Sequence, residues 1–158
     1  MVSNFHSLAP QTGKIDAKLV LKILETTRRD LKISNQTEVT VLVVGAAFIK
    51  NLNRRYRGIN KVTDVLSFSQ EEGLKLKLPK QANKYLGDIV LCWPQIKKQA
   101  KLFGHSLNEE FALLLIHGFL HLLGYEDNTD RQYQKMAKIQ DRILIKIYGK
   151  NKKAAKKL

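Results

Sequence analysis

Residues 106–124, SLNEEFALLLIHGFLHLLG, decide how this chain folds. The stretch begins with a capping-box pattern, a serine followed three positions later by a glutamate, which is typical of a helix start. The residues after it are apolar on nearly every side of a helix, so we expect a central, buried element. Gly124 follows the last apolar residue and supplies a C-terminal stop. The sequence therefore predicts a helix over 106–123 around which the other elements pack.

The other elements follow from hydrophobic periodicity and from turn residues. Helices are predicted at 16–29, 46–57, 94–103 and 130–148, and strands at 38–44, 64–68 and 86–92. The charged segment 71–84 contains Gly73 and Pro79, which is typical of a loop. Helix, strand, helix, strands and then helices indicate an α+β fold, with helices packed on a small mixed sheet.

Length and composition predict one domain in a reducing compartment. A chain of 158 residues fits a single domain, which we place at 1–149, followed by a basic tail at 150–158. The single cysteine, Cys92, excludes an intrachain disulfide framework. The N-terminus lacks the pattern of a secretory signal. The longest apolar stretch, 111–124, is shorter than the ~20 residues that span a bilayer. We therefore expect a cytoplasmic protein with no membrane partner.

The charge points to a polyanionic partner. The chain has 28 Lys and Arg against 14 Asp and Glu, a net charge of +14. Without the six lysines of the last thirteen residues an excess of +8 remains. It includes two basic stretches, 53–57 and 75–84, which are candidates for a phosphate-binding surface. A solvated tail or a general need for solubility is the alternative explanation.

Two histidines interrupt the apolar helix, His117 and His121. Their four-residue spacing places both imidazoles on one face, as when one helix supplies two ligands to a metal. Burying each ring without a partner would cost about 1–3 kcal/mol, so they need hydrogen bonds or a metal. The chain can reverse at Gly124 and carry Asp127 back toward them, with Glu126 and Asp130 as competing carboxylates. We expect a zinc site on the central helix.

The spacing His-x-x-x-His-x-x-Gly-x-x-Asp resembles that of the metzincin metalloproteases, whose third ligand also follows a glycine. Those enzymes carry a glutamate general base directly after the first histidine, and here that position is Gly118. Peptide hydrolysis is therefore disfavoured, and a metalloprotease-like hydrolase is kept only as an alternative.

Four blocks of sequence resemble the YbeY family of ribosomal RNA maturation factors. They are HGFLHLLGY at 117–125, LNRRYRG at 52–58 followed by TDVLSF at 63–68, LGDIV at 86–90 and GHS at 104–106. The family signature continues with Asp-His after the tyrosine, whereas this chain has Glu126-Asp127. Two usual prolines are replaced by Val62 and Ser69.

The resemblance implies a single-strand-specific, zinc-dependent endoribonuclease. Its expected role is maturation of the 3′ end of small-subunit (16S) rRNA and ribosome quality control. One Zn²⁺ per chain would be held by His117, His121 and Asp127. With aspartate as third ligand, the zinc centre would carry a charge of +1 instead of +2. The expected partners are single-stranded rRNA and the small ribosomal subunit, not DNA.

Arg57 matches the family's arginine and is our candidate catalytic residue, because a guanidinium can clamp a phosphate and offset its developing charge. Arg54, Arg55 and Lys61 are candidates for RNA contacts. The alternative for Arg57 is an exposed arginine at a helix end, facing the helix dipole. A non-catalytic ribosome-assembly RNA-binding protein, with zinc holding the fold, is the alternative function.

Overall fold

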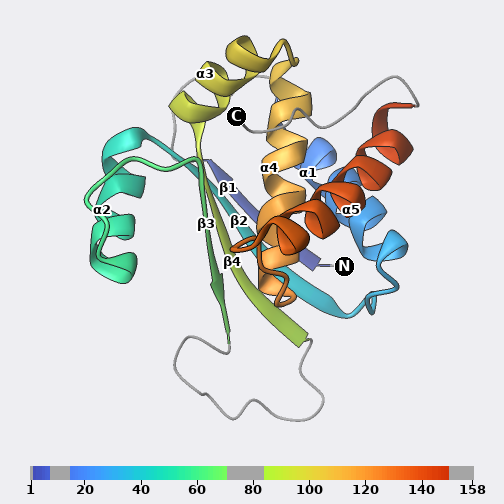
Figure 1. Ribbon diagram of the computed structural model, residues 1–158. Coiled ribbons are helices and arrows are strands. Elements are labelled where there is room, and N and C mark those ends of the chain that lie inside the picture. The colour runs from blue at the N-terminus through green and yellow to red at the C-terminus, as the bar shows by residue number, and fades with distance from the viewer. Residues whose placement is uncertain (1, 8–14, 71–83, 150–158) are drawn as a thin grey trace.

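The computed structural model describes residues 2–7, 15–70 and 84–149 (Figure 1). The predicted loop at 71–84, apart from its last residue, and the basic tail at 150–158 lie outside the described residues. Within the described part of the chain, no helix is both long and apolar enough to cross a membrane.

Among the described residues, four strands form one mixed sheet in the order β1-β2-β4-β3. They are β1 (Val2–Ser7), β2 (Thr37–Val44), β3 (Val65–Ser69) and β4 (Lys84–Cys92). Strands β1, β2 and β4 run parallel to one another, and the edge strand β3 runs antiparallel to β4. Strand β1 was not predicted, because a segment reading VSNFHS has a single β-branched residue. It forms by parallel pairing with β2.

The five helices of the described part of the chain confirm the predicted ones to within one residue at each end. They are α1 (Ala17–Asp30), α2 (Ala46–Arg57), α3 (Trp93–Phe103), α4 (Leu107–Leu122) and α5 (Asp130–Tyr148). Helices α1 and α4 cover one face of the sheet, α5 packs on these two helices, and α2 lies against the other face (Figure 1). The predicted α+β fold with a mixed sheet is confirmed.

Helix α4 occupies the centre of the larger core, as predicted. The Ser106 side chain accepts from the backbone N–H of Glu109, and the Glu109 carboxylate accepts from the N–H of Ser106. The largest fully buried side chains of α4 are Phe111, Leu114, Leu115, Ile116, Phe119 and Leu120. Burying each leucine or phenylalanine contributes about 1.5–3 kcal/mol, so the helix is firmly fixed. The partly exposed face of α4, which carries His117 and His121, is thereby held in one orientation.

A smaller core lies between α2 and the opposite face of the sheet. It contains Val44, Ile49, Leu66, Val90 and Cys92. Burial raises the pKa of the Cys92 thiol, consistent with the predicted core position. Only one side of α2 is used in this packing, and the last turn of the helix, 54–57, is exposed.

Candidate metal centre

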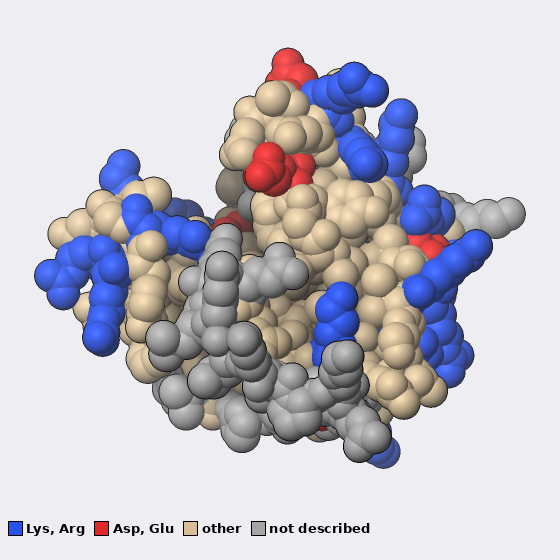
Figure 2. Space-filling view, turned by 90° about the horizontal axis from the view of Figure 1, so that it is seen from below, with Lys and Arg blue, Asp and Glu red and all other residues tan. Residues whose placement is uncertain are grey.

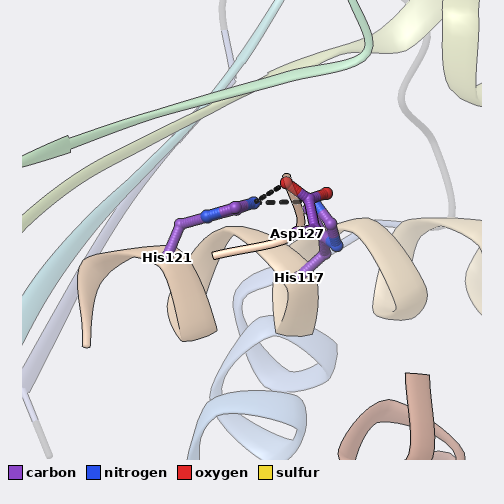
Figure 3. A group of neighbouring side chains, drawn as sticks. All are labelled: His117, His121 and Asp127. Carbon is purple, nitrogen blue, oxygen red and sulfur yellow. Dashed lines mark hydrogen bonds and ion pairs between the residues drawn. The ribbon is translucent and has the colours of Figure 1, made fainter. Parts of the chain in front are cut away.

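His117 and His121 lie one turn apart on α4, and their rings meet (Figure 3). The two Nε2 atoms are 2.9 Å apart, and the ring centroids are 4.5 Å apart. The His117 side chain is 13% exposed and the His121 side chain 29%, so the pair lies at the boundary between core and solvent. This arrangement follows from the i, i+4 spacing on a rigid helix.

Asp127 reaches the histidines because the chain reverses directly after α4. Gly124 has a φ of +88°, a left-handed conformation that favours glycine. Its N–H donates to the carbonyl of His121 at 3.0 Å. After this turn, Asp127 Oδ2 lies 3.5 Å from His117 Nε2, and Oδ1 lies 3.8 Å from His121 Nε2. The predicted approach of Asp127 to the histidines is confirmed.

These three side chains fit a zinc ion by donor chemistry and by spacing. Each offers one ligand atom, and these atoms lie within 4.8 Å of one another. Tetrahedral zinc with bonds of about 2.0–2.2 Å places neighbouring ligand atoms roughly 3.3–3.6 Å apart. The two Nε2 atoms are 2.9 Å apart, and Oδ2 and Oδ1 of Asp127 lie 3.5 Å from His117 Nε2 and 3.8 Å from His121 Nε2, so the three side chains are close to this spacing. Asp127 is 34% exposed, so this side of the group faces solvent.

The residue after the first histidine, Gly118, has no space for a side chain. A Cβ atom there would lie 2.7 Å from Ile89 Cγ2, 3.1 Å from Ser67 Oγ and 3.2 Å from Val65 Cγ2. The helix therefore approaches β3 and β4 too closely for the glutamate base of a metzincin. This close approach explains the departure from the protease motif.

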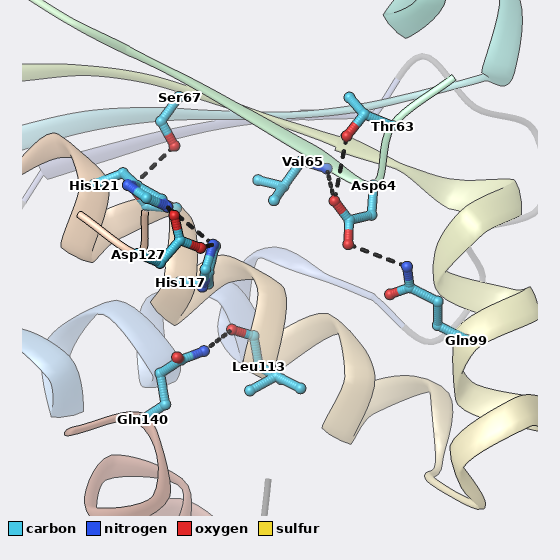
Figure 4. A network of polar contacts seen from close by, with 11 residues as sticks. Thr63, Asp64, Val65, Ser67, Gln99, Leu113, His117, His121, Asp127 and Gln140 are labelled. Atoms are coloured by element: carbon cyan, nitrogen blue, oxygen red, sulfur yellow. Dashed lines mark hydrogen bonds and ion pairs between the residues drawn. The ribbon is translucent and has the colours of Figure 1, made fainter. Parts of the chain in front are cut away.

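Arg57 lies against the edge strand β3 instead of among the three candidate ligands. Its Nη2 donates to the carbonyl of Ser67 at 2.8 Å, and its guanidinium lies 5.5 Å from the Phe68 ring centroid. The hydroxyl of Ser67 in turn donates to the carbonyl of Gly118 at 3.0 Å. Arg57 is thus linked to α4 through one residue of β3; Figure 4 shows the Ser67 side of this link.

The other predicted RNA-binding residues are exposed around the C-terminal end of α2. Arg54 donates to the side chain of Asn51 at 3.1 Å, and the backbone carbonyl of Lys61 accepts from buried Asn53 at 2.9 Å. Figure 2 shows Lys and Arg side chains gathered over α2, at the left of the molecule. The predicted basic stretch at 75–84 lies outside the described residues except for Lys84.

The neighbouring carboxylates act as structural acceptors. Asp64 accepts from the backbone N–H of Val65 at 2.8 Å and from Gln99 Nε2 at 3.1 Å (Figure 4). Of the carboxylates that compete with Asp127, Glu126 accepts from Gln132 Nε2 at 3.2 Å.

Sequence reasoning missed Ser67 and the aromatic residues Tyr56 and Phe68 beside Arg57. Tyr56 carried a usable signal, since an aromatic residue among arginines is typical of a surface that binds nucleic acid. Ser67 carried none, because a serine in a strand has no distinctive pattern.

The fold and the three candidate ligands define a class of protein. It is an α+β protein with a candidate metal centre of two histidines and one carboxylate, which are ligand types of hydrolytic zinc sites. Comparison with known proteins identifies the family. The family described as endoribonuclease YbeY matches residues 7–148. The chain belongs to the YbeY endoribonuclease family.

Individual relatives agree with this assignment. An endoribonuclease YbeY from Desulforamulus reducens is 40% identical over 130 residues, which cover 82% of this chain and 85% of the relative. That of Persephonella marina is 40% identical over 134 residues, covering 84% of each. A solution structure of a Thermotoga maritima protein superposes with a TM-score of 0.62 at 24% identity, covering 94% of this chain and 90% of that one. This last likeness concerns the fold alone.

Proposed function

We propose that this chain is a zinc-dependent endoribonuclease that cleaves single-stranded RNA, with His117, His121 and Asp127 holding one zinc ion. The observation that carries the proposal is the meeting of these side chains at the solvent-facing side of α4. The names of the relatives support it. When bound, zinc would supply activation of a water molecule and polarisation of a phosphoryl oxygen.

In the loaded site the two histidines would offer the lone pairs of their Nε2 atoms, which lie 2.9 Å apart. Each neutral imidazole would then carry its proton on Nδ1. The Asp127 carboxylate adds a negative charge that offsets part of the charge of the cation.

Arg57 is proposed to clamp the phosphate of the RNA. A guanidinium carries five N–H donors, so its hydrogen bond to Ser67 is compatible with a bidentate contact to a phosphate. The anchor on β3 orders the side chain before substrate arrives, which lowers the entropic cost of binding.

The cellular role that we propose is maturation of the 16S rRNA 3′ end and ribosome quality control in the cytoplasm, with the small ribosomal subunit as partner. The net charge of +14 supports a polyanionic substrate. Residues 1–149 would form the catalytic domain, and the tail 150–158 would add affinity that does not depend on sequence.

The test compares cleavage of single-stranded RNA by chelator-treated, zinc-restored and Arg57→Ala protein. We expect cleavage to vanish on chelation, to return with zinc, and to fall by about 10²–10³-fold in Arg57→Ala. Arg29→Ala is the matched control, because it removes the same charge from an exposed site on α1.

Two results would contradict the proposal. Cleavage that survives chelation and the Arg57→Ala substitution would point to a contaminating nuclease. RNA binding without cleavage by zinc-restored protein would favour the binding protein with a structural zinc.

A further inference from the structure

At the junction of α2 and β3, two aromatic rings in contact are flanked by one cation on each side. The Arg57 guanidinium lies 5.5 Å from the Phe68 ring centroid. Phe68 meets Tyr56 edge-on with the centroids 5.4 Å apart. The Arg55 guanidinium lies 5.6 Å from the Tyr56 centroid. We call Arg57, Phe68, Tyr56 and Arg55 the cation–aromatic ladder.

The ladder is largely open to solvent. Tyr56 is 57% exposed, although the helix has an apolar side where Ile49 is fully buried. Its neighbours on either side along the chain are exposed arginines. A large ring kept outside the core and flanked by cations has the composition of a nucleic-acid contact surface more than that of a packing element.

We propose that the cation–aromatic ladder is the base-stacking subsite for the RNA strand, with an unpaired base on Tyr56 and the adjacent phosphates on Arg55 and Arg57. This inference rests on the proposed function and names the residues that select its substrate. Bases of any identity offer a π-face, so stacking on Tyr56 binds RNA without reading its sequence. The cations supply the salt-dependent part of the affinity.

Stacking on Tyr56 selects single strands for a geometric reason. A base inside a duplex has both faces covered by its neighbours, whereas an unpaired base can be splayed out onto an aromatic side chain. The Arg57 end of the ladder is joined to α4 through Ser67 and Gly118. The ladder lies on the α2 face of the sheet and the candidate metal centre on the α4 face, so the RNA strand would pass over the edge strand β3 to reach both.

The charge of the surface favours RNA over a protein partner. Three further exposed cations lie in the same region of the chain, Lys50, Arg54 and Lys61. Together with the two arginines of the ladder they make five cations around the C-terminal half of α2. Figure 2 shows Lys and Arg side chains gathered in this part of the molecule. A polyanion that also carries flat rings complements both features of the surface.

The test measures binding of a short single-stranded RNA containing 2-aminopurine to the full-length protein with zinc, with RNA integrity checked on gels. Stacking on an aromatic ring quenches the fluorescence of this base analogue. We expect Tyr56→Ala to weaken binding by about 5- to 150-fold and to abolish the quench. Tyr56→Phe should retain both, because it keeps the ring.

Charge and aromatic contributions separate in salt titrations. Tyr56→Ala should leave the slope of log K against log salt unchanged, whereas Arg55→Gln should reduce it by about 0.7. Phe48→Ala is the matched control, since it removes a half-exposed ring from the other end of α2 and should bind like the wild type. Thermal unfolding of each variant verifies its fold.

The inference fails if Tyr56→Ala binds and quenches like the wild type, or if Phe48→Ala loses as much affinity. It also fails if Tyr56→Ala abolishes capture of a protein partner while RNA affinity is unaffected. These outcomes are independent of zinc-dependent cleavage, which is measured separately. If the zinc-loaded wild-type protein does not cleave RNA but still quenches the fluorescence of 2-aminopurine, the proposed function is wrong, whereas the stacking role of the cation–aromatic ladder is retained.

Discussion

Adding a single methyl group at Gly118 should destabilise the protein, although alanine is the better helix former. In an open helical position, Gly→Ala stabilises by about 1 kcal/mol. Here the new Cβ would lie 2.7 Å from Ile89 Cγ2, roughly 1 Å inside the optimal carbon–carbon distance of about 3.5–4.0 Å. Ile89 is fully buried and β-branched, so its methyl cannot rotate away. Overpacking of this kind costs about 1–3 kcal/mol.

The net expectation for Gly118→Ala is a loss of about 1 kcal/mol in the free energy of unfolding, measured by urea denaturation. The melting temperature should fall by about 2–4 °C. The added methyl should also push β3 away from α4 at Ser67, next to His117, and so weaken zinc binding measured by chelator competition.

Ile89→Leu provides the control, because leucine has no methyl branch on Cβ. In that background Gly118→Ala should cost less, with a coupling energy of about 1 kcal/mol between the two positions. If Gly118→Ala stabilises the wild type by the full helix-propensity gain, or if the two substitutions are additive, the close approach of α4 to the sheet is not what excludes a side chain at 118.

Three further outcomes are expected. The Arg142 guanidinium, with Lys146, holds the pKa of Asp30 below its ordinary value, so this contact stabilises above the unfolded pKa of about 3.9 and is lost as the pH falls. At pH 7, Asp30→Asn should lower the free energy of unfolding by about 1 kcal/mol in urea titrations, a small loss because both cations are half exposed. The difference between the two proteins should narrow as the pH falls below about 3.9. A constant difference down to pH 2 would contradict this. In chelator competition, Asp127→Ala should lower zinc affinity by at least about 10–100-fold and Asp127→His should retain it; full occupancy in the alanine variant would exclude Asp127 as a ligand. Removing residues 150–158 should weaken RNA binding and flatten its salt dependence, by about 0.7 per lost phosphate contact, while cleavage persists; a folded but inactive truncation would place function in the tail.

The sequence by itself determined the helices and the grouping of the three candidate ligands. Capping residues, apolar periodicity and a stop glycine act within a few residues of one another, so α4 was predicted to within one residue at each end. The same local physics aligns His117 with His121, and the turn at Gly124 brings Asp127 back to them. Whether they bind zinc stays a prediction.

Only the tertiary structure decided what lies across from these local elements. Strand β1 forms because β2 offers it a partner for parallel pairing. The side chain of Arg57 contacts β3 instead of the three candidate metal ligands. Tyr56 meets Phe68, and Gly118 meets Ile89, across segments whose spacing along the chain gives no sign of contact. Such contacts depend on how closely each helix packs on the sheet. This closeness is set by the summed packing of many distant side chains, which no local pattern records.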